Sequence, residues 1–143
     1  MTVNQVSVFI ENKKGTMSAV TKLLAENNIN MRGMIVADTQ DYGILRLIVS
    51  DTVRTVQILK DHGMIALLTP VLAVEIPDVP GGLAEVLAIL AEGEVNVEYV
   101  YAFLADRGNR AHVVFRVENN AEAEAVLEKG GVRMLSEEDL AAL

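Results

Sequence analysis

Two short turns, each with a glycine at its end and a short polar residue before it, carry the groups best suited to hold a small molecule. The first reads IENKKGTM from Ile10, and the second reads IPDVPGGL from Ile76. A glycine at a helix entrance allows a tight turn and brings backbone N–H groups close to a ligand. Because a helix N-terminus carries partial positive charge and unpaired N–H donors, each turn suits a carboxylate.

A short polar side chain precedes each glycine and could receive the ammonium group of the same ligand. Asn12 stands in the first turn and Asp78 in the second. Asn30 and Asn96 open the expected second strands nearby and supply both donor and acceptor groups. A zwitterion with a carboxylate and an ammonium group matches these partners, so the sequence predicts an amino-acid site in each half.

The same residues also have purely structural interpretations. Gly15 and Gly81 could serve only as turn glycines, and Asn30 and Asn96 could cap the turn that precedes a strand. Met31 could pack in the core instead of lining a pocket. Recurrence of the whole set at two places in the chain favours ligand binding over structure alone.

Other chemistry is poorly represented in the sequence. The chain has no cysteine, and its two histidines, His62 and His112, lack carboxylates at a metal-ligand spacing. There is no GxxxxGK[ST] loop, and no Ser–His–Asp order stands out. Residues 16–27 and 82–91 lack the arginine that would hold a phosphate inside the first helix. We therefore expect no enzymatic activity, no metal and no cofactor.

The charge and hydropathy of the chain limit the classes of molecule that it is expected to bind. The net charge is −8, and residues 71–143 carry 5 Lys and Arg against 14 Asp and Glu. Such a surface repels polyanions, so neither a nucleic acid nor an anionic membrane is expected. No apolar run reaches the roughly 20 residues that span a bilayer. The N-terminus lacks a basic segment followed by an apolar one, so a cytoplasmic location is expected.

The chain contains one unit twice. Residues 8–31 align with 74–97 at an offset of 66, which becomes 68 after the hairpin. Gly15 then falls on Gly81, and further along Gly63 falls on Gly131. The second glycine-rich turn is therefore not a linker but the second occurrence of a loop. We place one domain at residues 1–69 and another at residues 70–143, with a short C-terminal helical tail.

Each copy has the predicted order β-α-β-β-α-β. Asp51 is a suitable N-cap for a second helix, and Gly63 lies where a helix C-terminus favours a left-handed residue. Ser136 followed by Asp139 resembles a capping box for the tail helix. Helical spacing of apolar residues predicts a first helix in each copy, at Met17, Val20 and Leu24 and again at Leu83, Val86 and Leu90.

This pattern predicts an α+β fold of two tandem ferredoxin-like βαββαβ units, with antiparallel sheets and helices on one face. The layout resembles the ACT domain, a small regulatory module of amino-acid metabolism, in tandem. ENKKG with NIN is similar to the loop and strand start that hold serine in the regulatory domain of phosphoglycerate dehydrogenase. The resemblance implies ligand contacts from Ile10, Asn12 and Asn30, and from Ile76, Asp78 and Asn96.

Ile10 and Ile76 depart from the serine-binding pattern, which has a histidine there. The change makes the pocket more apolar and slightly favours an apolar or aromatic ligand side chain. The candidate ligand-binding residues are Ile10, Asn12, Gly15, Thr16, Met17, Asn30 and Met31 in the first copy, and Ile76, Asp78, Pro80, Gly81, Gly82, Leu83, Asn96 and Val97 in the second.

The resemblance implies a non-catalytic regulatory protein that binds a free amino acid at ACT domain interfaces and signals its level to a partner. A homodimer is expected, and a separate regulated enzyme is a possible partner. Lys13 and Lys14 in one turn and Asp78 in the other suggest that one site binds well while the other is weak or silent. Two alternatives remain: a ligand-free oligomerisation or docking module and, more remotely, a small enzyme on the ferredoxin-like fold.

Overall fold

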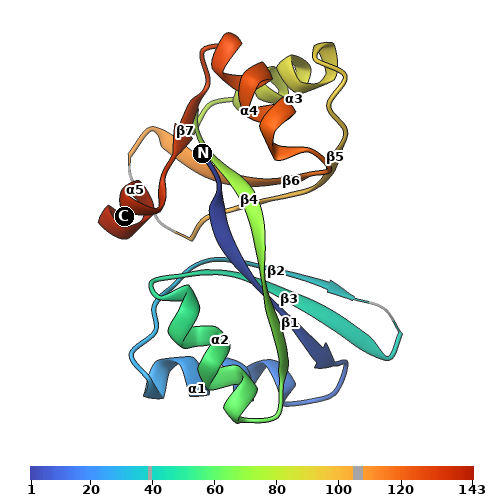
Figure 1. The fold of residues 1–143 in the computed structure, drawn as a ribbon, viewed down its shortest axis with the longest axis vertical. Coiled ribbons are helices and arrows are strands. Elements are labelled where there is room, and N and C mark those ends of the chain that lie inside the picture. Colours follow the sequence, from blue (N-terminus) through green and yellow to red (C-terminus); the bar gives the residue numbers. More distant parts are fainter. Residues whose placement is uncertain (39, 105–107) are drawn as a thin grey trace. The chain divides into compact units, whose positions relative to one another are not determined.

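A computed structural model describes residues 1–38, 40–104 and 108–143, which form two compact units (Figure 1). The N-terminal unit is Asn4–Thr69, and the C-terminal unit is Met1–Val3 with Pro70–Leu143. The division between Thr69 and Pro70 coincides with the boundary placed from the repeat. Met1–Val3 differ from the sequence-based assignment and belong to the C-terminal unit, where the Met1 amino group pairs with the Glu124 carboxylate.

The N-terminal unit has the predicted β-α-β-β-α-β order. Its sheet runs β2-β3-β1 with β4 beside β1, and β3 is antiparallel to both of its neighbours. Two helices lie on one face of this sheet (Figure 1) and enclose a core of Val, Leu and Ile side chains. The elements are β1 (Val3–Glu11), α1 (Thr16–Glu26), β2 (Met31–Asp38), β3 (Tyr42–Val49), α2 (Thr52–Asp61) and the first part of β4 (Ile65–Pro77).

The C-terminal unit repeats this arrangement, with sheet order β7-β4-β6-β5. Two helices again lie on one face of the sheet, while the last helix is set apart from them (Figure 1). Leu140 of that last helix is buried, so the tail packs on its own unit. After β4 the elements are α3 (Gly82–Glu92), β5 (Val97–Ala102), β6 (Arg110–Val117), α4 (Asn120–Lys129), β7 (Arg133–Leu135) and α5 (Glu137–Ala142).

One strand serves both units. The sequence suggested two separate strands, but β4 continues through Thr69 and Pro70 without a break. Proline has no N–H to give to a ladder but adopts extended backbone readily, so it interrupts pairing without ending the strand. No helix in the described part of the chain is long and apolar enough to cross a membrane. The cytoplasmic location stays a prediction.

The local signals for helix ends are confirmed. Asp51 Oδ1 accepts a hydrogen bond from Arg54 N at 3.0 Å, and Gly63 has φ of +77°. Ser136 and Asp139 form a reciprocal capping box at the start of α5. The segment DRGNR at residues 106–110, whose composition predicts a turn between the second and third strands of the second copy, falls partly outside the described residues.

Candidate functional site at the helix entrances

Both glycine-rich loops place a glycine in the left-handed conformation directly before a helix. Gly15 has φ of +84° before α1, and Gly81 has φ of +90° before α3. The first helical N–H is used inside each loop: Thr16 N donates to Lys13 O at 3.3 Å, and Gly82 N donates to Val79 O at 3.0 Å. The N–H groups of the two residues that follow in each helix have no partner within the helix and point out of its end.

Side-chain caps distinguish these two helices from the others that the structure describes. No side chain caps α1 or α3. The remaining helices begin with a capping side chain that accepts from a backbone N–H, namely Asp51 for α2, Asn119 for α4 and Ser136 for α5. The two equivalent entrances therefore keep backbone donors for an external acceptor, with the partial positive charge of the helix behind them.

Gly82 is needed for a reason other than backbone conformation. A Cβ added there would lie 2.2 Å from the carbonyl oxygen of Pro77. The start of α3 therefore approaches the end of β4 more closely than a side chain allows. The equivalent residue in the first copy is Thr16, so α1 enters with enough space for a Cβ.

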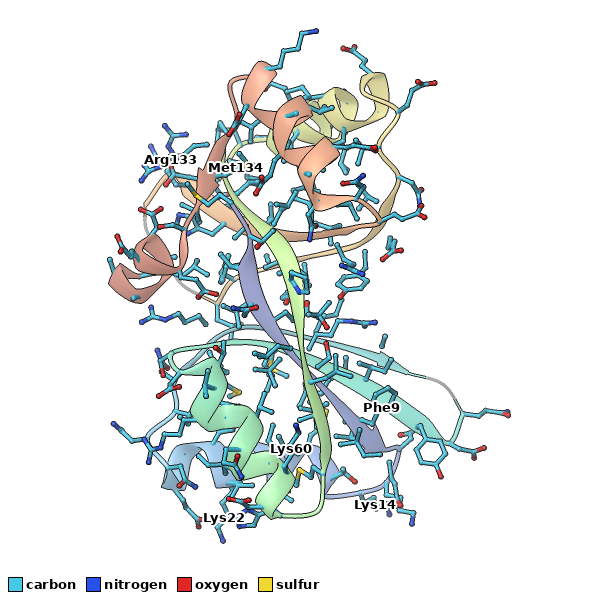
Figure 2. The ribbon with its side chains drawn as sticks, in the orientation of Figure 1. Phe9, Lys14, Lys22, Lys60, Arg133 and Met134 are labelled. Atoms are coloured by element: carbon cyan, nitrogen blue, oxygen red, sulfur yellow. The ribbon has the colours of Figure 1, made fainter. Side chains whose placement is uncertain are left out.

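The N-terminal unit has a cavity of about 330 Å³ beside the α1 entrance, which we call the N-terminal cavity. Of the predicted residues, only Ile10 and Thr16 line it. Figure 2 shows Phe9 near the end of β1 and Lys14 in the loop that follows. The other lining residues come from β1, α1, β3 and the turn between α2 and β4, and most are apolar: Phe9, Glu11, Val20, Tyr42, Gly63, Met64 and Ile65.

The polar residues of the first loop are tied to their neighbours. Asn12 N donates to Asp41 O at 3.0 Å, and its Nδ2 contacts Gln40 O at 3.4 Å. Lys13 Nζ lies 2.6 Å from a Glu11 carboxylate oxygen, and this hydrogen bond raises the pKa of Lys13. The Lys13 charge is thus balanced by Glu11, which weakens the expectation that Lys13 helps to make one site bind better than the other.

Asn12, Thr16 and Met17 meet in a smaller recess of about 100 Å³ next to the N-terminal cavity. Met17 is 38% exposed, and its counterpart Leu83 is 37% exposed. The helical pattern would turn both toward a core, yet Val20 and Val86, one turn later, are the first helix residues whose apolar side chains are buried. An apolar side chain is therefore accessible at each helix entrance.

The C-terminal unit has a cavity at the equivalent place, of about 370 Å³, which we call the C-terminal cavity. It lies between the α3 entrance and the turn into β7, and Gly82 is the only predicted residue among its lining. Asp78 instead donates its backbone N–H to Asn109 O at 2.9 Å. Charged residues that the sequence analysis did not single out line this cavity, namely Glu75, Glu85, Arg110 and Arg133.

A charged cluster surrounds Glu75, whose side chain is only 14% exposed. Arg110 Nε lies 3.8 Å and Arg133 Nη1 lies 3.5 Å from Glu75 Oε1. His112 Nε2 lies 3.3 Å from Oε2 of the same carboxylate. His112 is buried, and its Nδ1 has no hydrogen-bond partner among the described residues. On the α5 side, these four residues line a second cavity of about 240 Å³, and all of them except His112 also line the C-terminal cavity.

Asn30 and Asn96 do not lie near the loops of their own units. Glu11 pairs with Tyr42 at one end of the N-terminal sheet, whereas Met31, which follows Asn30, pairs with Val49 at the other end. The physical reason is that α1 returns the chain to the starting end of β1 before β2 begins. The expectation that Asn30 lies close to Asn12 is therefore wrong within one unit.

The same separation holds in the C-terminal unit. Pro77 pairs with Arg110 near the loop, whereas Val97, directly after Asn96, pairs with Val117. Met31 and Val97 at these strand starts are partly buried against the cores, which agrees with the structural alternative. Within one unit, therefore, a loop and the second-strand asparagine do not form a single site.

The turns between α2 and β4 and between α4 and β7 are the part of the site that the sequence analysis missed. Gly63 and Gly131 were matched as repeat partners but not connected with the loops before α1 and α3. Both glycines line the cavities. Across the residues that the structure describes, no group of three or more His, Asp or Glu side chains could hold a metal ion.

Comparison with known proteins agrees with this architecture. A family model described as ACT domain pair matches residues 1–143. The solved structure of protein BT0572 from Bacteroides thetaiotaomicron is 39% identical with a TM-score of 0.92, covering 100% of this chain and 98% of that one. The regulatory subunit of aspartate kinase from Thermus thermophilus, in a ligand-free form, is 20% identical with a TM-score of 0.67, covering 90% and 89%.

A second structure with this fold is the regulatory subunit of aspartate kinase from Thermus flavus. It is 19% identical with a TM-score of 0.61, covering 90% of this chain and 92% of that chain. No curated protein matches the sequence. Two repeated βαββαβ units and a full-length match to the family model lead to one conclusion: the chain belongs to the ACT domain family, as an ACT domain pair.

Proposed function

We propose that this protein is a non-catalytic regulator that binds a free amino acid and signals its level to a partner. The observation that carries the proposal is the N-terminal cavity, an apolar cavity directly beside an uncapped helix entrance. One end of such a site offers backbone donors for a carboxylate, and the other end offers apolar surface for a side chain.

The proposed ligand places its carboxylate against the backbone N–H groups of Met17 and Ser18. Its ammonium group lies toward Asn12 Oδ1, and its side chain enters the N-terminal cavity between Phe9 and Met64. About 330 Å³ corresponds to about eleven waters at roughly 30 Å³ each, which accommodates a large side chain. The apolar lining favours an aliphatic or aromatic amino acid, in agreement with the expectation from Ile10.

The regulatory part of the proposal rests on the family and on its relatives. Solved structures with this fold include regulatory subunits of aspartate kinase. By analogy we propose a separate enzyme as the regulated partner of this chain. We include a homodimer in the proposal, because a second chain could bring Asn30 or Asn96 to a loop that its own unit keeps distant from it.

A thermal-shift screen with the twenty L-amino acids tests the proposal. A ligand that binds only the folded state adds about 2.7 kcal/mol at a hundredfold excess over Kd, enough to raise Tm by several degrees. We expect one or a few apolar amino acids to do so. A flat panel on dimeric protein would contradict amino-acid binding and favour the docking module.

Variants identify the site of any stabilising amino acid. Ile65→Asn introduces a polar side chain at the wall of the N-terminal cavity and should weaken binding about tenfold or more, because the ligand side chain would face an amide. Val53→Asn is the matched control, since Val53 lies on α2 and is exposed to a similar extent, 72% against 66%. Asn96→Ala should weaken binding, with folding intact, if a second chain completes the site.

A further inference from the structure

Three equivalent positions at the cavities hold uncharged side chains in the N-terminal unit and charged side chains in the C-terminal unit. In the N-terminal unit they hold two aromatic residues and an isoleucine, all of which line the N-terminal cavity. In the C-terminal unit the equivalent positions hold a carboxylate and two guanidinium groups, all of which line the C-terminal cavity. The repeat offsets of 66 and 68 give the pairs as Phe9 with Glu75, Tyr42 with Arg110, and Ile65 with Arg133.

We propose that Arg110 and Arg133 make the C-terminal cavity a binding site for a small carboxylate. This ligand differs in class from the apolar amino acid proposed for the N-terminal cavity. The inference goes beyond the proposed function because it adds a second ligand, and it does not require that the first site exists.

The strand pairing brings the charged groups to one place. Glu75 lies directly opposite Arg133 on β7 and opposite His112 on β6. Arg110 opens β6 opposite Pro77, at the end of the sheet where α3 begins. Arg133 and Met134 follow each other on β7 (Figure 2), and Met134 packs against the core. Since neighbouring strand residues point to opposite faces, Arg133 faces away from that core.

The distances leave the guanidinium groups able to bind another anion. Both arginines lie 3.5 to 3.8 Å from Glu75 Oε1, whereas a charge-assisted N–H···O hydrogen bond spans about 2.8 Å. Glu75 therefore holds the two groups near each other without a close hydrogen bond to either one. Asp139 Oδ1 lies 3.9 Å from Arg133 Nη2, which is likewise too far for a close hydrogen bond. Their side chains are 56% and 63% exposed, and a guanidinium can bind a carboxylate through two parallel N–H donors.

Charge distribution makes this convergence unusual for the chain. Residues 71–143 contain only 5 Lys and Arg against 14 Asp and Glu, and two of those five cations meet at Glu75. Glu85 on the α3 side also lines the cavity, so an ammonium group on the ligand would have a partner there. The volume of about 370 Å³ accommodates a dicarboxylate or an acidic amino acid.

Isothermal titration calorimetry tests the site with glutarate and L-glutamate at constant ionic strength. The uncharged diamide of glutaric acid is the reference compound. We expect at least one acid to bind and the diamide not to bind. Arg110→Gln and Arg133→Gln should each weaken binding about tenfold or more, the effect of losing hydrogen bonds to a charged group. Absence of binding by both acids, or equal binding of the diamide, would overturn the proposal.

Arg116→Gln is the matched control for charge and residue type. Arg116 is on the same strand, six residues from Arg110, and pairs with Glu98 on β5 at 3.2 Å. It should change glutarate or glutamate affinity by less than about twofold, because Glu98 already balances the Arg116 charge and dissolved salt screens charges that lie six strand residues apart. Ile65→Asn should likewise leave this binding unchanged, so failure of the amino-acid site and failure of this site are distinguishable.

Glu75→Gln separates binding from a structural role. The substitution removes the carboxylate that attracts the two guanidinium groups while keeping its shape, so the carboxylate ligand should bind several-fold more tightly. A cluster that only supports the fold would give no such increase, and unchanged or weaker binding would contradict the proposal. Arg133→Lys keeps the charge and is the control for misfolding of Arg133→Gln. Its affinity for the carboxylate ligand should lie between the affinities of the native protein and of Arg133→Gln.

Discussion

Replacing Gly82 with alanine should destabilise the protein, although alanine is the better helix former. Gly82 is the first residue of α3, and a Cβ there would stand 2.2 Å from the Pro77 carbonyl oxygen. An ordinary contact of 3.4 Å would require about 1.2 Å of movement between the helix and the end of β4. The obstacle is backbone, so no side-chain rotation can remove it.

The expected size follows from two opposing effects. Overpacking of this kind costs about 1–3 kcal/mol. Alanine recovers up to about 1 kcal/mol of helix propensity relative to glycine. We expect a net loss of about 1–2 kcal/mol, which lowers Tm by about 3–7 °C if the whole chain unfolds together.

Thermal and urea unfolding followed by circular dichroism measures the change. Thr16→Ala is the matched control, because Thr16 occupies the equivalent position with a Cβ already present and loses only an exposed hydrogen bond to Lys13 O. Its stability should change by less than about 1 kcal/mol. Unchanged or increased stability of Gly82→Ala would refute the close approach of α3 to β4.

Three further predictions concern caps, core and tail. Asp51→Ala removes the side-chain acceptor of Arg54 N and should cost about 1 kcal/mol in urea unfolding. Leu24→Ala should cost about 2–5 kcal/mol because Leu24 is fully buried, whereas 38%-exposed Met17→Ala should cost far less. Hydrogen bonds from Ser136 lower the pKa of Asp139, so its contribution to α5 is present at neutral pH and is lost as pH falls through the folded-state value. The protection factors of the α5 amides in hydrogen exchange, measured against pH with Asp139→Asn as reference, should fall as pH falls. Protection factors that do not change with pH would contradict this prediction.

Much of the fold could be predicted because its signals are local and occur twice. The helix caps at Asp51 and Ser136 and the left-handed glycines depend on residues only a few positions apart. The repeat then gave the order of strands and helices without knowledge of tertiary contacts. The continuity of β4 was missed because the repeat assigns the residues before and after the join at Thr69 and Pro70 to strands of different copies.

The candidate site could be predicted only in part because it combines distant segments. The loops before α1 and α3 were found from their glycines, but the cavities also need the turns at Gly63 and Gly131. The two arginines of the C-terminal cavity have no motif that distinguishes them in the sequence. Asn30 was assigned to its own loop because one line of sequence does not show that α1 reverses the chain.

A nuclear magnetic resonance titration of the isotope-labelled chain with the twenty L-amino acids most directly tests whether the N-terminal unit binds an amino acid at the α1 entrance. We predict that at least one apolar amino acid shifts the amide signals of Met17 and Ser18 together with that of Met64, on the other side of the N-terminal cavity. If all twenty leave these amides unchanged at millimolar concentration, the unit does not bind free amino acids there. Shifts confined to other regions would contradict this site as well.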